Sequence, residues 1–282
     1  ASIDMPLKWD DFAARRVIWS PKTTHIESIA EEINIGLDAV IFIDDNPFEL
    51  NEVRHSLPMV DCYPFDGKSA DSALNLLASC AGLTTWAVTE EDRRKSDQYK
   101  EEAERKSLRA GTGSVDDYIR TLGIKIQVGI NRHDQIARIS QLTNKTNQFN
   151  LTTRRYSAAQ IEELMDSQTV LDFRVADRYG DLGIVGVIIL RDQEIDTFLM
   201  SCRALGREIE ANMLAVAIEL SGSRQLRASF VPTSKNSMVA DFYDRHGFEL
   251  ISSDGAGKNY IVGAGPSLKF EFEIERISGG KP

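Results

Sequence analysis

The hydrophobic pattern of residues 1–86 changes between a helical period and short apolar runs. Apolar residues recur at helical spacing over residues 26–37, in TTHIESIAEEINIGL, where Gly36 marks the end of the predicted helix. The apolar run at residues 40–43 predicts a buried strand that ends in the acid pair Asp44 and Asp45. NPFELNEVRHSLP and MVDCYPF then predict a short helix and a second strand. Helix, strand, helix, strand is the order of part of a parallel sheet.

Residues 89–110, TEEDRRKSDQYKEEAERKSLRA, carry mixed charges at high density and no apolar stripe. Thr89 and Asp92 resemble a capping box, and Gly111 follows the last helical residue. Mixed charge at this density is typical of a solvated helix rather than of a binding site. We therefore expect a charged helical linker over residues 89–111, which separates residues 1–88 from residues 112–282.

The pattern of residues 112–282 alternates again and predicts a separate α/β unit. The predicted helices cover residues 115–122, 133–143, 157–166, 207–220 and 236–246. The predicted strands cover residues 124–130, 169–176, 183–191, 195–202, 226–231, 248–252, 258–262 and 267–275. No internal repeat or low-complexity tract interrupts this order.

Composition narrows the class of protein. The 282 residues include 42% hydrophobic and 27% charged residues, which is ordinary for a globular chain. The formal net charge of −10 argues against nucleic acid as the main partner. The N-terminus lacks a secretory pattern, and no apolar run approaches the ~20 residues that span a bilayer. Three cysteines, Cys62, Cys80 and Cys202, are an odd number and far apart. We expect a cytoplasmic chain without disulfides and without a membrane partner.

The acid pair Asp44 and Asp45 has two interpretations. Carboxylates at the carboxyl end of a parallel strand are suitable ligands for Mg²⁺, and Lys22, at the start of the preceding helix, can balance phosphate charge beside them. Alternatively the acids cap the next helix, which begins with Asn46 and Pro47.

A second candidate site follows the strand predicted at residues 195–202. Arg203, Gly206 and Arg207 lead into the helix at 207–220, and backbone N–H groups at such a turn can bind an anion. Cys202 lies beside an arginine and close to a helix N-terminus, and both features favour a thiolate that can accept an acyl group. The alternative is a cysteine that acts as a small apolar core residue.

Amide side chains gather in TNKTNQFNL, between the two helices predicted at 133–143 and 157–166. Such amides can bind substrate hydroxyls or the amides of a pantetheine arm, or they can cap the loop that carries them. The following pair, Arg154 and Arg155, offers a local basic patch to an acidic partner. The candidate substrate-binding amides are Asn144, Asn147 and Gln148.

The segment SPKTTHIESIAEEINIGLDAVIFIDDNPFELNEVRHSLP resembles the later half of a haloacid-dehalogenase-type phosphatase domain, of the FkbH-like variety found in polyketide biosynthesis. The resemblance implies that Lys22, Asp44 and Asp45 are the third and fourth phosphatase motifs, with Mg²⁺ held by the two acids. The nucleophilic Asp-x-Asp of that fold has no counterpart upstream of Lys22. We expect either a piece of a longer protein or a degenerate domain, and no aspartyl-phosphate chemistry from these residues alone.

Residues 124–282 resemble the Gcn5-related acetyltransferase fold, which FkbH-like proteins carry after the phosphatase domain. NSMVADFYDRHGFEL is similar to a coenzyme-binding segment of that fold. The resemblance implies a partial Rossmann-like parallel sheet followed by a mixed-sheet α/β domain. Asn236 is then a ligand-binding residue and Tyr243 a general acid for the departing thiol; the alternative for Tyr243 is a core tyrosine. The usual pyrophosphate loop reads R-x-x-G-x-G/A, but this chain has Glu208 at the last position, and an acid there repels phosphate.

The FkbH-like resemblance implies transfer of a glyceryl group from a phosphorylated three-carbon acid, through a thioester on Cys202, to an acyl carrier protein. The acceptor is then the phosphopantetheine thiol of the carrier protein. Two alternatives remain open: a coenzyme A-dependent acetyltransferase, and a non-catalytic fragment that docks a carrier protein. Glu208 speaks against the first alternative, and the missing phosphatase nucleophile supports the second.

Overall fold

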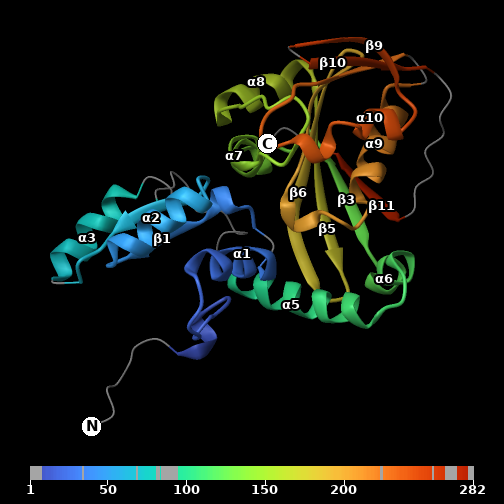
Figure 1. Ribbon diagram of the computed structural model, residues 1–282. Helices are drawn as coiled ribbons and strands as arrows, with labels where there is room; N and C mark the ends of the chain where they lie inside the picture. Colours follow the sequence, from blue (N-terminus) through green and yellow to red (C-terminus); the bar gives the residue numbers. More distant parts are fainter. Residues whose placement is uncertain are drawn as a thin grey trace. The chain divides into compact units, whose positions relative to one another are not determined.

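Two compact units, Ala1–Ser107 and Leu108–Pro282, make up the computed structural model in Figure 1. The structure describes residues 8–33, 35–67, 69–80, 83, 95–222, 225–255, 257–263 and 272–278. In these ranges no helix combines the length and the hydropathy that a membrane crossing requires.

The first unit is built on two parallel strands. Its elements are η1 (Trp9–Asp11), α1 (Lys22–Glu32), η2 (Leu37–Ala39), β1 (Ile41–Asp44), α2 (Pro47–Ser56), β2 (Asp61–Pro64) and α3 (Ala70–Ser79), followed by most of α5 (Lys95–Gly111). β1 and β2 pair in parallel, with Ile41 opposite Asp61, so the predicted helix–strand–helix–strand order and its parallel pairing are present. Ile26, Val53 and Leu57 form a small core. Two strands alone do not establish a Rossmann-like phosphatase domain.

One boundary in this unit differs from the prediction. α1 ends at Glu32 rather than at Gly36, and Leu37 begins a 3₁₀ turn instead of continuing the apolar stripe of the helix. The charged segment forms α5 from Lys95, as predicted for its later part, and residues 89–94 of the predicted linker lie outside the described residues.

A nine-stranded mixed sheet forms the second unit, in the order β11-β3-β5-β6-β7-β8-β10-β9, with β4 added to β7. The strands are β3 (Lys125–Ile130), β4 (Phe149–Asn150), β5 (Thr169–Asp177), β6 (Gly180–Arg191), β7 (Glu194–Met200), β8 (Leu226–Phe230), β9 (Glu249–Asp254), β10 (Gly257–Val262) and β11 (Glu273–Ser278). β11 pairs with β3, and β7 with β8, in parallel; the other pairs are antiparallel. The predicted mixed-sheet α/β class is confirmed for this unit.

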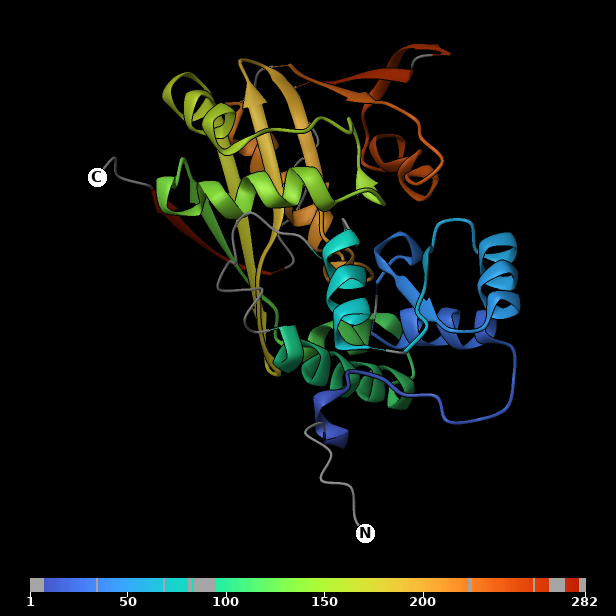
Figure 2. The same cartoon turned by 90° about the vertical axis from the view of Figure 1, so that its left-hand side faces the viewer.

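Helices cover both faces of this sheet, as Figures 1 and 2 show. They are α6 (Val115–Leu122), η4 (His133–Gln135), α7 (Ile136–Lys145), α8 (Ala158–Ser167), η5 (Cys202–Ala204), α9 (Ile209–Leu220), η6 (Ser237–Val239) and α10 (Phe242–Arg245). Apolar residues of α7 and α8 pack on one face with Val187 and Leu199. Residues of α6, α9 and α10 form the larger core on the other face with Phe173 and Phe198. Alternate apolar residues of β7 therefore pack into the cores on the two opposite faces of the sheet.

The strands β7 and β8 pair over two residues only, Glu194 with Arg227 and Ile195 with Ala228. Beyond this point a different segment lies between them. The N–H of Leu151 donates to the Phe198 carbonyl at 3.0 Å, and the N–H of Val231 donates to the Leu151 carbonyl at 2.8 Å. The backbone around β4 therefore fills the gap where β7 and β8 diverge. This short strand was not predicted from the sequence.

Candidate functional site

The carboxyl ends of β7 and β8 lie at the same edge of the sheet, because the two strands are parallel. Ligands of α/β proteins bind at such an edge, beside the helices that follow the strands. Here the turn before α9 follows β7, and the loop before α10 follows β8. Cys202, Arg203, Gly206 and Arg207 come from the first connection and Asn236 from the second, so the fold brings these predicted residues to one edge.

Cys202 is half-buried and opens the 3₁₀ turn η5 rather than ending β7. β7 stops at Met200, and the chain turns because the N–H of Leu205 donates to the Cys202 carbonyl at 3.1 Å. The neighbouring Arg203 is half-buried as well, and its Nε lies 3.5 Å from the Ser201 hydroxyl. A thiol that is partly accessible, next to a guanidinium and ahead of a helix, has the surroundings of a reactive cysteine.

The other two cysteines have different surroundings. Cys80 is completely buried. Burial raises the pKa of the Cys62 thiol, and its Sγ donates to the Val60 carbonyl at 3.5 Å. The surroundings of both residues fit a structural role.

The turn before α9 has a strained backbone. Gly206 has φ +74°, and Glu208, the N-cap residue of α9, has φ +58°, which residues other than glycine rarely adopt. Arg207 is 2% exposed, and its guanidinium donates to the Arg203 carbonyl, so this arginine braces the turn from inside. The side chain of the N-cap residue, Glu208, makes no capping hydrogen bond. Since Arg207 is buried, it is not a surface cation at this turn.

Asn236 holds the two connections together. It is fully buried, and its Nδ2 donates to the carbonyls of Asn150 and Val231, both at 2.9 Å. Its Oδ1 accepts from the N–H of Thr233 at 2.7 Å. Both amide protons are thus committed to the backbone. Asn236 acts as a clamp between β4 and the loop after β8, whereas the resemblance assigned it to a ligand.

The amides of the α7–α8 connection mostly cap their own loop. Asn144 donates to the carbonyls of Ser140 and Tyr156, both at 2.9 Å. Asn147 accepts from Arg155 at 2.6 Å. Gln148 is half-buried, and no hydrogen bond to its amide is found among the described residues. Of the candidate binding amides, Gln148 has the amide that is most available to a ligand.

Asp196 is a buried carboxylate on β7 that the sequence analysis did not single out. It is 1% exposed, and it accepts from the Tyr156 hydroxyl at 2.5 Å, from the Thr197 hydroxyl at 2.9 Å and from Arg154. Arg191 lies 3.3 Å from the same carboxylate. Arg154 is therefore an anchor for the loop as well as a surface cation, and this contact limits the basic patch proposed for it.

Tyr243 belongs to the core. It is 1% exposed and packs against Phe248 and Tyr260, with ring centroids 4.9 and 5.4 Å away. Burial raises the pKa of its hydroxyl, with a further contribution from the charge of Glu194. Glu194 begins β7, whereas Cys202 follows its other end. The hydroxyl has no hydrogen-bond partner among the described residues. This placement favours the core tyrosine over the general acid.

The residues expected to hold Mg²⁺ lie in the first unit. Asp44 accepts from the N–H of Asn46 at 2.8 Å, and Asn46 caps α2 by accepting from Phe48 at 3.0 Å. Lys22 is the first residue of α1, and in the described part of the chain no ion pair joins it to Asp44 or Asp45. Nor does any group of three or more His, Cys, Asp or Glu side chains in those ranges have the arrangement of metal ligands. Mg²⁺ prefers six oxygen ligands, so these residues do not fit a magnesium site by themselves.

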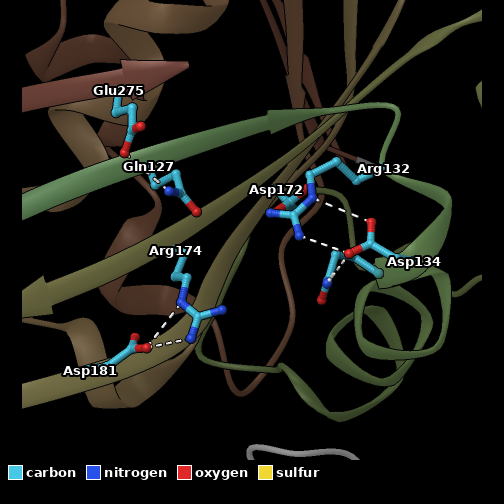
Figure 3. A network of polar contacts seen from close by, with 8 residues as sticks. Gln127, Arg132, Asp134, Asp172, Arg174, Asp181 and Glu275 are labelled. Atoms are coloured by element: carbon cyan, nitrogen blue, oxygen red, sulfur yellow. Dashed lines mark hydrogen bonds and ion pairs between the residues drawn. The ribbon is translucent and has the colours of Figure 1, made fainter. Parts of the chain in front are cut away.

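A polar network on the α7–α8 face of the sheet contains a second buried carboxylate, Asp172 (Figure 3). Asp172 is fully buried and lies opposite Gly129 in the β3–β5 register. Arg132 Nη1 lies 3.9 Å from Asp172 Oδ1, while Arg132 Nη2 donates to Asp134 Oδ2 at 2.8 Å. Neither Asp172 oxygen has a hydrogen bond in the described residues, and burial raises the pKa of this carboxyl to about 6. The signal in the sequence is an acid inside the apolar strand VLDFRV.

No protein-family profile and no curated protein matches the chain. Among solved structures it is similar to an N-acetyltransferase from Staphylococcus aureus, with 12% identity over 49% of this chain and 97% of that one and a TM-score of 0.35. It is also similar to aminoglycoside acetyltransferase AAC(6')-Ib in complex with coenzyme A, with 13% identity over 49% and 94% and a TM-score of 0.35. A third match is the PaiA N-acetyltransferase from Thermoplasma acidophilum in complex with coenzyme A, with 12% identity over 48% and 98% and a TM-score of 0.32. All three TM-scores are below 0.5, so these likenesses carry no argument about activity.

Proposed function

We propose that this chain transfers a glyceryl-type acyl group to the phosphopantetheine thiol of an acyl carrier protein, through a thioester on Cys202. The observation that supports this proposal is the placement of Cys202. It is half-buried, it follows β7 at the junction of two parallel strands, and it precedes the N-terminus of α9, whose N-cap side chain makes no capping hydrogen bond. This is where an α/β fold offers backbone donors to a developing negative charge.

The chemistry needs a thiolate at Cys202 and a second thiol as acceptor. The guanidinium of the neighbouring Arg203 favours the thiolate form. Because the starting and the final compound are both thioesters, the exchange is nearly balanced in free energy and can run in either direction. The half-buried amide of Gln148 is available for a hydroxyl group of the acyl unit.

Carrier protein and coenzyme A differ in the charge that they bring to α9. Coenzyme A carries a diphosphate, and the α9 N-terminus already has Glu208 as its N-cap residue and Glu210 in its first turn. Carboxylates compensate the positive end of the helix dipole and repel a diphosphate. The arm of a carrier protein has one phosphodiester at its far end, so it avoids most of this repulsion. These two glutamates support the carrier protein over the coenzyme A-dependent alternative.

The donor is, by the family resemblance, a phosphorylated three-carbon acid. In this proposal the acyl group reaches Cys202 as a thioester, and the proposal does not include the removal of its phosphate. The non-catalytic alternative, in which the chain only docks a carrier protein, predicts binding without transfer.

The experiment is an acyl exchange between two carrier proteins of different mass, one loaded with a glyceryl thioester and the other carrying the bare phosphopantetheine thiol. Mass spectrometry of both carriers follows the appearance of glyceryl on the second one. The proposal predicts catalysed exchange that Cys202→Ala abolishes and Cys62→Ala preserves. Exchange into coenzyme A at the same rate would support the coenzyme A-dependent alternative. If the chain binds both carrier proteins but catalyses no exchange, the result would support the non-catalytic alternative, in which the chain only docks a carrier protein.

A further inference from the structure

A cavity of about 410 Å³ lies between α8 and the turn that joins β6 to β7. Its volume is in the range of about 300–1,000 Å³ that is usual for small-molecule sites. One wall is a stripe of α8 that includes Glu163 and Ser167 at helical spacing. The other wall contains Arg191 at the end of β6 and Asp192 in the turn. The cavity is therefore near the start of β7, whereas Cys202 follows the other end of this strand.

A buried carboxylate holds Arg191 at this cavity. Asp196 is 1% exposed, and its Oδ1 lies 3.3 Å from Arg191 Nε and also contacts Arg154 Nη1. Its Oδ2 accepts from the hydroxyl of Tyr156, which lines the cavity, at 2.5 Å and from the Thr197 hydroxyl at 2.9 Å. Two guanidinium groups thus share one carboxylate, and together they carry more N–H donors than its two oxygens can accept. Positive charge and hydrogen-bond donors remain in surplus beside the cavity.

The outer end of the Arg191 guanidinium has room for a ligand. The side chain is 45% exposed, and its contact with Asp196 uses Nε. In the described part of the chain this side chain has no other ion pair or hydrogen bond. Nη1 and Nη2 are therefore available to an anion in the cavity, and a guanidinium binds a carboxylate well through two parallel hydrogen bonds.

The lining also carries negative charge. Glu163 and Asp192 are exposed carboxylates, one on each wall, and no ion pair to either is found within the described ranges. A purely anionic ligand meets repulsion from both of them, and a purely cationic ligand meets repulsion from Arg191. A ligand that carries both charges satisfies all three groups. Leu164 and the ring of Tyr156 add apolar surface for the carbon frame between those charges.

We propose that this cavity binds a small zwitterion of the class of free amino acids, with an ammonium and a carboxylate group on a short apolar frame. Arg191 binds the carboxylate, and Glu163 and Asp192 bind the ammonium group. Asp196 is a positioning residue that fixes the guanidinium from the interior. The site is separate from Cys202, so the inference does not depend on acyl transfer at that cysteine.

The test is isothermal titration calorimetry of the full chain with unbranched amino acids that differ in the distance between their two charges. The series consists of glycine, γ-aminobutyrate and ε-aminocaproate, and caproate and hexylamine are the matched compounds with one charge each. We expect saturable binding of at least one amino acid, with an affinity about tenfold or more above that of caproate or hexylamine. If no member of the series binds to the folded chain, or if caproate or hexylamine binds equally well, the inference is wrong.

Two variants assign the binding to this cavity. Arg191→Gln should weaken the binding of that amino acid about tenfold or more, and so should Glu163→Gln combined with Asp192→Asn. The second variant changes two exposed positions only, so it tests the site even if Arg191→Gln lowers the melting temperature by leaving Asp196 less compensated. Arg120→Gln, at an exposed position of α6, is the control and should bind like the wild type. Unchanged affinity in the Glu163→Gln and Asp192→Asn double variant would overturn the inference.

Discussion

Asp172 gives the sharpest prediction about stability. The group is fully buried with neither oxygen hydrogen-bonded among the described residues, and burial raises its pKa from the ordinary value of 3.8 to about 6. The native state therefore binds this proton more tightly than the unfolded chain. The contribution of Asp172 to the free energy of unfolding is fully present below about pH 4 and is lost as the pH rises through about 6.

The magnitude follows from the two pKa values. The step from 3.8 to about 6, at about 1.4 kcal/mol for each factor of ten, corresponds to about 3 kcal/mol. Asp172→Asn keeps the shape and removes the titration. The difference in unfolding free energy between variant and wild type should therefore grow in favour of the variant by up to about 3 kcal/mol between about pH 4 and about pH 8. The pKa of about 6 already includes the attraction between the Asp172 carboxylate and Arg132. The loss of this attraction in Asp172→Asn therefore needs no separate correction.

The assay is urea unfolding at a series of pH values, followed by circular dichroism. Asp181→Asn is the control, since Asp181 accepts from Arg174 at 3.0 Å and is half-buried rather than enclosed. A difference between Asp172→Asn and wild type that stays constant over the whole pH range would refute the reasoning.

Two further substitutions test the packing around the site and the network. Gly129→Ala places a Cβ against Asp172 Oδ2 and Arg132 Cδ, whereas nothing lies within 4 Å of a Cβ at Gly113. Thermal unfolding should show that Gly129→Ala lowers the free energy of unfolding by about 1–3 kcal/mol. Gly113→Ala is the control and should change it little. Asn236→Ala removes the clamp between β4 and the loop after β8; the free energy of unfolding should fall by about 2 kcal/mol, and an equal effect of Asn259→Ala, at an exposed position, would contradict the clamp.

Helix positions could be predicted where the local signals were complete. Residues 115–122 were predicted as a helix, and α6 covers Val115–Leu122. The side chain of Ser114 caps its N-terminus, and Gly123 ends it in a left-handed conformation with φ +61°. Both signals are visible in the sequence. By contrast, the helix predicted over residues 236–246 is reduced to η6 and the four-residue α10, because Asn236 ties this loop to the backbone of β4.

Long-range pairings explain most of what the sequence did not reveal. β4 has two residues, and its position depends on Leu199 and Met200, about fifty residues later. Asp172 becomes a buried charge only through its register with Gly129. The ring contacts of Phe242 with Phe149 and Phe198 join α10 to β4 and β7. Local periodicity contains none of this information, whereas the order of strands and helices follows from it directly.

The central claim is that Cys202 carries the acyl group. Intact-protein mass spectrometry after incubation with a glyceryl-loaded carrier protein tests it most directly, with Cys202→Ala and Cys62→Ala treated in parallel. The account predicts one glyceryl adduct on the wild type and on Cys62→Ala, and none on Cys202→Ala. An adduct that persists in Cys202→Ala, or a folded wild type that stays unmodified beside an intact donor, would contradict the account.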